Sequence, residues 1–306
     1  MIRKIKNKLL RGREVAGLLE EVLRSVTAIR ASGDLVALYG SPTGPHWLGI
    51  ANATRGLYGG TAIEIPQSYS NPVFTTTQLR QLSEKIIALK FKRVVISGFA
   101  PYFFDMIDRL SGHCEIQTIY HGTISEFHSP VQQQLIKGLI SYARTGKVQE
   151  VSFVKEGLAE VFIRLYGLHA THLPLQAPHI PPGVTPIAVD PLKTHIGVFG
   201  GDTFNKNLHN QVIYALMIPN TIVHVLDDKM FDYLDMNERI VGHGTHLPKE
   251  KFLSILGAMT VNLYMSYSES WGLVAYESEA MGVPAVRMDH VDYYEKILTA
   301  IESRKR

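Results

Sequence analysis

The chain has 306 residues, of which 45% are hydrophobic, and its formal net charge is +3. No apolar run approaches the roughly 20 residues that span a bilayer, no apolar segment follows the basic start, and Cys114 is the single cysteine. The sequence therefore predicts a globular cytoplasmic protein large enough for two domains, with no transmembrane segment, no secretory signal and no intrachain disulfide.

The surplus of positive charge lies at the start of the chain, where six basic residues precede the first acid, Glu14. Four apolar residues interleave with them at spacings that share one helix face: Ile2, Ile5, Leu9 and Leu10. This pattern is typical of a helix that lies on an anionic membrane surface or contacts phosphates. It is equally typical of a solvated helix that packs on its own domain. Peripheral contact with an anionic surface is therefore one of two open interpretations.

Helical and extended patterns alternate through the first half of the chain. The expected helices are 15–26, 48–57, 77–89, 103–110, 131–142 and 156–166. The expected strands are 34–39, 61–65, 93–97, 115–120 and 151–154. Strands that alternate with helices pair in parallel through crossovers, so this half predicts a parallel α/β sheet.

Six prolines between positions 174 and 191 are typical of a linker, and the alternation restarts after them. The expected strands are now 195–199, 221–226, 239–241, 260–264 and 284–286, and the expected helices are 210–217, 249–256, 272–281 and 291–306. The predicted organisation is a first domain 1–173, a linker 174–191, a second domain 192–289 and a C-terminal helix 290–306 that packs back on the first domain. Ligands of open parallel sheets bind at the carboxyl ends of the strands, so we expect the site in a cleft between the domains.

The stretch from Ser266 to Glu277 follows an expected strand and leads into an expected helix. A helix N-terminus offers unpaired N–H groups and partial positive charge, which suit a diphosphate. The carboxylate of Glu277 can accept two hydrogen bonds from a ribose diol, and that of Glu269 can hold a sugar hydroxyl or stabilise positive charge on an anomeric carbon. Glutamate is common in helices, so these residues alone leave a purely structural role open.

The segment from Ser268 to Pro284 resembles the E-x7-E signature of retaining GT-B glycosyltransferases of the family 4 type. The spacing of the two glutamates, the glycines and the proline all agree with that signature. The resemblance implies a GT-B fold with two Rossmann-like domains that face an interdomain cleft. It also implies transfer of a sugar from a nucleoside-diphosphate sugar, with retention of configuration, to an acceptor bound by the first domain. A glycan, a lipid-linked intermediate, a protein, DNA and a small molecule stay open as acceptors.

The resemblance also implies roles for individual residues. Glu277 would bind the donor ribose and Glu269 the donor sugar. The N–H groups of Leu273 and Val274, just after Gly272, would hold the distal phosphate. The implied catalytic residues are Glu269 and His121, and the implied donor-binding residues are Glu277, Lys206, Gly44, Gly201, Trp271, Gly272, Leu273 and Val274.

Four of these residues lie outside the signature: Gly44, Gly201, Lys206 and His121. Lys206 falls on the family's phosphate lysine, although a solvated surface lysine is the alternative. Gly201 stands where the family has an arginine, so the implied diphosphate site lacks one cation. His121 follows the strand 115–120, where the family often has a histidine near the donor sugar, although a lone histidine at a strand end is more often structural.

No metal or cofactor is expected apart from the donor substrate. His243 and His246 suggest a metal site, but their spacing is poor for a helix and no cysteine or acidic cluster accompanies them. Two other functions stay open. One is an epimerase or phosphorylase of the same fold, and the other is a non-catalytic sugar-nucleotide binder, which the missing arginine favours.

Overall fold

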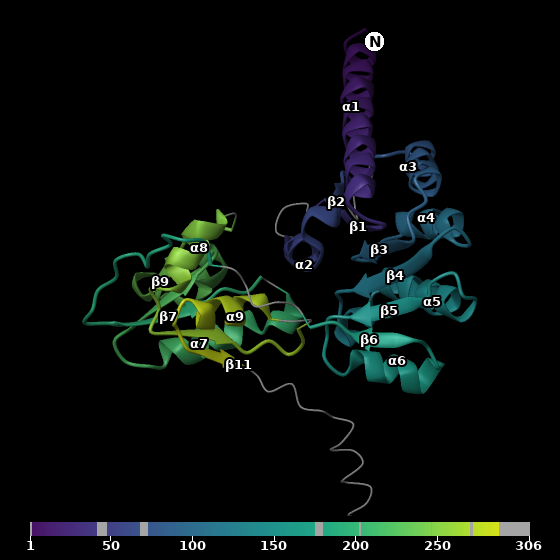
Figure 1. The fold of residues 1–306 in the computed structure, drawn as a ribbon. Coiled ribbons are helices and arrows are strands. Elements are labelled where there is room, and N and C mark those ends of the chain that lie inside the picture. Colours follow the sequence, from purple (N-terminus) through teal and green to yellow (C-terminus); the bar gives the residue numbers. More distant parts are fainter. Residues whose placement is uncertain are drawn as a thin grey trace, which may run out of the picture. The chain divides into compact units, whose positions relative to one another are not determined.

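The structure is a computed structural model that describes residues 2–41, 48–67, 73–174, 180–201, 203–245, 247–269 and 272–287. The chain divides into two compact units, Met1–Gln176 and Ala177–Arg306, and each unit is built on its own parallel sheet (Figure 1). The boundary between the units falls in the proline-rich stretch. The expected C-terminal helix 290–306 lies outside the described residues.

The first unit contains a six-stranded sheet with the order β2-β1-β3-β4-β5-β6, and all neighbouring pairs are parallel. Its strands are β1 (Leu35–Gly40), β2 (Ala62–Ile65), β3 (Arg93–Ser97), β4 (Glu115–Tyr120), β5 (Glu150–Phe153) and β6 (Ala170–His172). Its helices are α1 (Ile2–Ser32), α2 (Leu48–Tyr58), α3 (Thr76–Ala88), α4 (Tyr102–Leu110), α5 (Pro130–Arg144) and α6 (Leu158–Tyr166).

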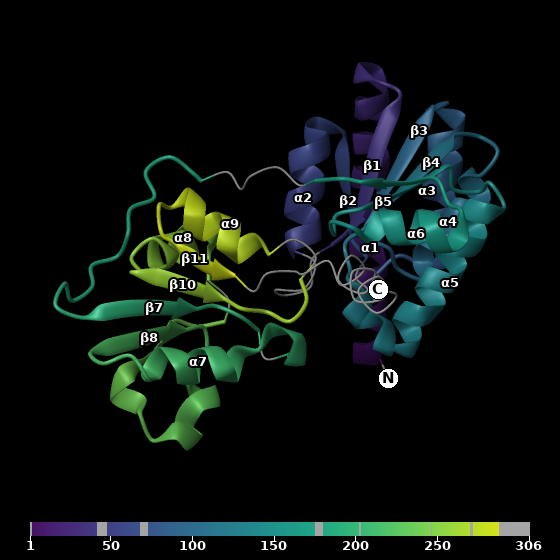
Figure 2. The same ribbon diagram turned by 90° about the horizontal axis from the view of Figure 1, so that it is seen from below.

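The two faces of this sheet carry different covers. One face packs on α1, α3, α4, α5 and α6 and forms the main core, whereas the opposite face packs on α2 (Figure 2). The alternation of side chains explains the division, because Val36 and Leu38 belong to the main core and Ala37 to the smaller one. The strands are buried on both faces, which is why they appear in the sequence as continuous apolar runs.

Two elements of the first unit differ from the expectation. α1 is one helix of 31 residues, in which the basic start and the periodic stretch from Val15 to Val26, expected as separate patterns, are continuous. None of the described helices, α1 included, is long and apolar enough to cross a membrane. β6 was not expected, because its three residues carry no alternating apolar pattern, yet it pairs with β5 at the edge of the sheet.

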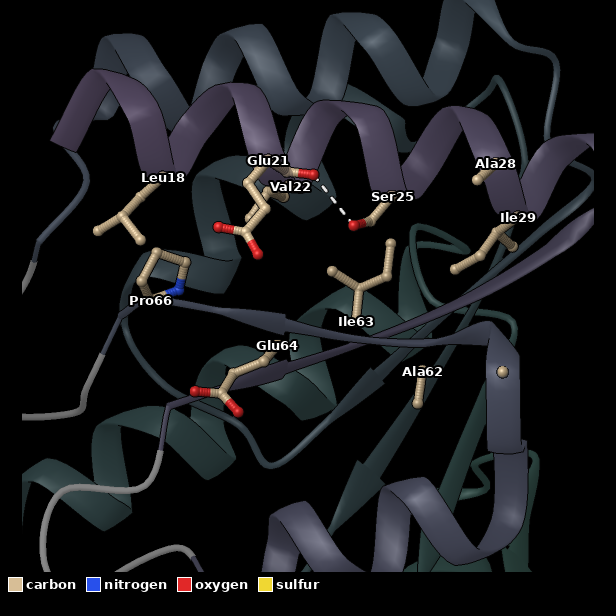
Figure 3. Close-up of a pocket in the computed structure, with 11 residues that line it drawn as sticks. Leu18, Glu21, Val22, Ser25, Ala28, Ile29, Ala62, Ile63, Glu64 and Pro66 are labelled. Carbon is tan, nitrogen blue, oxygen red and sulfur yellow. Dashed lines mark hydrogen bonds between the residues drawn. The ribbon is translucent and has the colours of Figure 1, made fainter. Parts of the chain in front are cut away.

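A pocket of about 550 Å³ in the first unit lies between α1 and the edge strand β2 (Figure 3). Leu18, Glu21 and Val22 line it from the helix, and Ile63 and Glu64 line it from the strand. None of the predicted site residues is among its lining residues.

The second unit contains a five-stranded parallel sheet with the order β11-β10-β7-β8-β9. Its strands are β7 (Thr194–Val198), β8 (Thr221–Val225), β9 (Ile240–Gly242), β10 (Val261–Tyr264) and β11 (Ala285–Arg287). Its α-helices are α7 (Leu208–Leu216), α8 (Lys249–Leu256) and α9 (Leu273–Ala280). α7 covers one face of the sheet, and α8 and α9 cover the other (Figure 2).

Candidate functional site

The order of strands in the second unit marks the position of the candidate site. β7 and β10 are neighbours, but the strands that follow them in the sequence, β8 and β11, lie on opposite sides of this pair. Such a point is a topological switch point, and open α/β sheets bind their ligands beside it, at the carboxyl ends of the strands. The loops that follow β7 and β10 contain Lys206 and Glu269, respectively.

Hydrogen bonds tie these two loops together. The side chain of Asn207 donates to the carbonyl oxygen of Met265 at 3.0 Å, and the buried Gln211 donates to the carbonyl oxygen of Lys206 at 2.8 Å. Gln211 also accepts from the backbone N–H of Met265 at 2.8 Å. The backbone at Asn207 has a φ of 54°, a left-handed conformation that asparagine adopts more readily than most residues. The loops therefore form one preorganised support for the side chains they carry.

Lys206 and Glu269 form an ion pair across this support. The Nζ atom of Lys206 lies 2.5 Å from Oε1 of Glu269, and the side chains are 26% and 8% exposed. The hydroxyl of Tyr264, at the end of β10, faces the same carboxylate. Burial, and next the charge of Glu269, raise the pKa of Tyr264 above its usual range, so the phenol stays protonated at neutral pH. Lys206 is therefore a partly buried member of a charged cluster rather than a solvated lysine.

Gly272 shapes the start of α9. Its φ is +78°, a left-handed conformation, and a Cβ atom there would lie 3.0 Å from a ring carbon of Tyr264. A side chain at this position would therefore meet both backbone strain and a crowded ring. Leu273 and Val274 are the first two residues of α9, so their N–H groups are among those for which the helix itself supplies no acceptor.

Glu277 lies one turn further along α9 and is paired with a residue that the sequence analysis missed. Its carboxylate forms a salt bridge with Lys249, the first residue of α8, and its side chain is only 2% exposed. Burial raises the pKa of Glu277, and Lys249 opposes that shift. Lys249 is 28 positions away in the sequence and belongs to no motif, so only its position at a helix N-terminus, where a cation is disfavoured, signals a special role.

Gly201 follows β7 and is exposed. A Cβ atom built at this glycine meets no atom of the described residues within 4 Å. A Cβ atom therefore fits, among the described residues, at the position where the family has an arginine.

His121 belongs to the first unit and follows β4. Its Nε2 atom lies 2.9 Å from the hydroxyl oxygen of Ser97, and Thr54 in turn donates to Ser97 at 2.6 Å. Burial lowers the pKa of His121 to about 4, so the imidazole is neutral at pH 7. A neutral imidazole that accepts from Ser97 through Nε2 carries its proton on Nδ1 and can donate it to a ligand. Gly44 and Trp271, which complete the predicted set, lie outside the described residues.

Three other histidines form a hydrogen-bonded chain across the second sheet. Nδ1 of His195 lies 2.8 Å from Nε2 of His224, and Nδ1 of His224 lies 2.8 Å from Nε2 of His243. Burial lowers the pKa of His224 to about 4, with further contributions from His243 and His195. Within the described ranges, no group of three or more His, Cys, Asp or Glu side chains is arranged to hold a metal ion. His246 lies outside the described residues.

No protein-family model and no curated protein sequence matches the chain. Solved structures do match it. Sucrose-phosphate synthase from Thermosynechococcus elongatus is 12% identical and has a TM-score of 0.59, over 83% of this chain and 81% of that chain. HepE from Anabaena, solved in complex with UDP and glucose, is 13% identical and has a TM-score of 0.55, over 82% and 80%.

OtsA, solved in its apo state, is 13% identical and has a TM-score of 0.55, over 83% of this chain and 84% of that chain. At identities this low, the likeness concerns the fold. The chain has the GT-B fold. The fold class predicted from the sequence, two Rossmann-like α/β units with parallel sheets, is thereby confirmed.

Proposed function

We propose that the chain is a retaining glycosyltransferase that binds a nucleoside-diphosphate sugar at the switch point of the second unit. The observation that carries this proposal is the clustering of Lys206, Glu269 and the N-terminus of α9 at the carboxyl ends of β7 and β10. A cation and unpaired N–H groups suit a diphosphate, and a buried carboxylate beside them suits the hydroxyls of a sugar.

Each part of the donor has a proposed partner in this cluster. The diphosphate binds Lys206 and the N–H groups of Leu273 and Val274. The ribose hydroxyls bind Glu277, and the transferred sugar binds Glu269. In the free protein Lys206 and Glu269 neutralise each other. The donor would replace that bond, because its phosphate takes the ammonium group and its sugar takes the carboxylate.

The proposed reaction is a front-face displacement. The bond between the anomeric carbon and the diphosphate oxygen breaks, and the acceptor oxygen bonds to the same face of that carbon. The acceptor proton passes to the departing diphosphate, whose charge Lys206 and the α9 amides stabilise. Glu269 stabilises the positive charge on the sugar. His121, neutral at pH 7, is the proposed hydrogen-bond donor to a sugar hydroxyl.

A panel of UDP-, GDP-, ADP- and CDP-sugars in a thermal-unfolding assay tests the proposal. A donor at 100 times its dissociation constant is expected to add about 2.7 kcal/mol of stability to the state that binds it. Glu277→Gln is expected to weaken binding at least about tenfold, because hydrogen bonds to a charged group contribute about 1.5–3 kcal/mol. The matched control is Glu279→Gln on the same helix. Glu279 is not a proposed donor-binding residue, because its carboxylate is held in a salt bridge with Arg287 at 2.6 Å.

The same donor then separates the proposed function from its alternatives. A transferase releases nucleoside diphosphate from the bound donor, either by transfer of the sugar or, in the absence of acceptor, by slow hydrolysis of the donor. An epimerase releases none but changes the sugar, and a non-catalytic binder leaves the donor intact. Absence of a thermal response to every donor in the panel would contradict the proposal as a whole.

A further inference from the structure

We propose that Lys249 is a positioning residue for donor binding, which keeps the buried carboxylate of Glu277 ionised and oriented toward the hydroxyls of a ribose. This inference deepens the proposed function and rests on it. Neither the signature in the sequence nor the comparisons assign a role to Lys249.

The geometry of two helices brings the pair together. Side chains of an α-helix tilt toward its N-terminus, so Glu277, five residues into α9, points back toward the end where the N–H groups are unpaired. Lys249 is the first residue of α8 and reaches the same carboxylate. Glu277 is 2% exposed, so it has almost no contact with water, and Lys249 replaces the solvation that burial removes.

The position of Lys249 costs stability in its own helix. The N-terminus of a helix carries partial positive charge, so a cation in the first turn is disfavoured. The neighbouring residue, Glu250, is acidic, and acidic residues are the type that the first turn of a helix favours. A lysine here is therefore explained by its partner on α9 rather than by the helix that contains it.

The other charged and titratable groups around Glu277 do not compensate the charge of its carboxylate, so this role falls to Lys249. Tyr264, on β10, faces both glutamates, and its phenol is neutral at the working pH because burial raises its pKa. Glu269 is bound to Lys206. On α9 itself, Glu279 is bound to Arg287. Among the described residues, Lys249 is thus the cation in contact with Glu277.

Loss of this cation would couple ribose binding to pH. A carboxylate offers only acceptors and can receive both ribose hydroxyls, whereas a protonated carboxyl loses part of that capacity to its own O–H. Burial raises the pKa of Glu277 and Lys249 lowers it, so removal of Lys249 moves this pKa upward. Below the pKa, affinity for a ribose falls about tenfold per pH unit, and the variant reaches that regime at a higher pH than the native protein.

The test is titration calorimetry of the full chain with UDP, GDP, ADP and CDP and with their 2′-deoxy counterparts. The measurements run from roughly pH 5.5 to 8.5, which overlaps the range in which proteins are generally most stable. The variants are Lys249→Met, the conservative Lys249→Arg, and Lys251→Met as the matched control on the exposed face of the same helix. Circular dichroism at each pH verifies that every variant is folded.

The expected result is an affinity of Lys249→Met that is at least about tenfold below that of the native protein at low pH and approaches it at high pH. The preference for the ribose over the deoxyribose nucleotide should shrink at low pH in the same variant. Lys249→Arg should restore both properties, and Lys251→Met should behave as the native protein.

Three negative results are possible, and they have two different meanings. If the native protein binds one of the nucleotides and Lys249→Met has the same pH profile and the same ribose preference, the inference is wrong and the proposed function stands. The same holds if affinity drops equally at every pH, because that is the signature of a structural defect. If the native protein binds none of the eight nucleotides, the proposed function is wrong, and the inference falls with it.

Discussion

At the scale of single residues, the candidate site is a set of charges that neutralise one another while no donor is bound. Lys206 faces Glu269, and Lys249 faces Glu277. Both glutamates are buried, so removal of either lysine would leave an uncompensated charge with little access to water. In the proposed function, a donor that brings two phosphates and several hydroxyls offers each of these groups an alternative partner, so binding would be an exchange of partners.

Gly201→Arg is expected to strengthen the binding of a nucleoside diphosphate about tenfold, because an additional hydrogen bond between charged groups contributes about 1.5–3 kcal/mol. A Cβ atom at this position meets no described residue within 4 Å, and the backbone is not in the left-handed region. Isothermal titration with UDP measures the effect. Gly201→Gln, which is long and polar but uncharged, is the control. Equal affinities of the arginine and glutamine variants would contradict a phosphate site beside Lys206.

At the scale of elements, the strands were predicted well and the contacts between elements were not. The bounds of β3 and β4 agree with the expected strands 93–97 and 115–120, since both are runs of β-branched and apolar residues between turns. α8 likewise begins and ends where it was expected, at 249 and 256. β6 was missed because Ala-Thr-His at a sheet edge needs no apolar pattern.

The candidate site was predictable only in part, for a related reason. Glu269, Gly272 and Glu277 belong to one contiguous motif, so their register is visible in the sequence. The partners Tyr264 and Lys249 reach the site through the packing of β10 and α8, and no spacing rule connects them to the motif. The same is true of the three histidines, which come from β7, β8 and the end of β9.

This histidine chain predicts how the second unit responds to acid. The pKa of His224 is held at about 4, below its ordinary value of 6.5, so below pH 6.5 the unfolded state binds a proton that the folded state does not. The contribution to stability is complete above pH 6.5 and is lost as the pH falls toward 4. The slope is at most about 1.4 kcal/mol per pH unit for this group.

In the variant His224→Gln, the free energy of unfolding should therefore decrease less steeply as the pH falls below 6.5. The substitution also lowers the stability at pH 7. Urea unfolding at pH 7, 6 and 5 measures this slope. Trp47→Phe in both proteins leaves Trp271 as the single tryptophan, and its fluorescence then reports on the second unit alone. If the free energies of unfolding of the native protein and of the variant fall in parallel as the pH is lowered, His224 is not the group that takes up the proton.

At the scale of the whole molecule, two units each have a core and a sheet of their own, and the first unit also carries α1. α1 has 31 residues, which correspond to about 46 Å of helix. Among residues 14–32 of α1, whose side chains the structure describes, the buried core residues are Leu19, Val22, Val26 and Ile29. The basic residues in its first half are therefore continuous with a rigid element that is anchored in the core.

Removal of residues 1–13 is expected to reduce binding to vesicles that contain anionic lipid and to leave the fold intact, because the described contacts between α1 and the core, from Val15 onward, are all retained. Each basic residue near an anionic surface contributes about 1 kcal/mol, so the loss should be large at low salt and small at high salt. Co-sedimentation with phosphatidylserine vesicles measures it, and phosphatidylcholine vesicles are the control. If the intact chain fails to sediment with either lipid, α1 is a solvated helix.

The ion pair between Lys206 and Glu269 also has a consequence for biosynthesis. Its two members are 63 positions apart, and β8, β9 and α8 lie between them in the chain. A ribosome delivers the lysine several seconds before the glutamate, at about 5–20 residues per second. During that interval the nascent chain has the cation of the site without its counter-charge or the helix that completes it. If the proposed donor site is correct, the newborn protein therefore acquires its nucleotide affinity only after Glu269 and α9 have been synthesised.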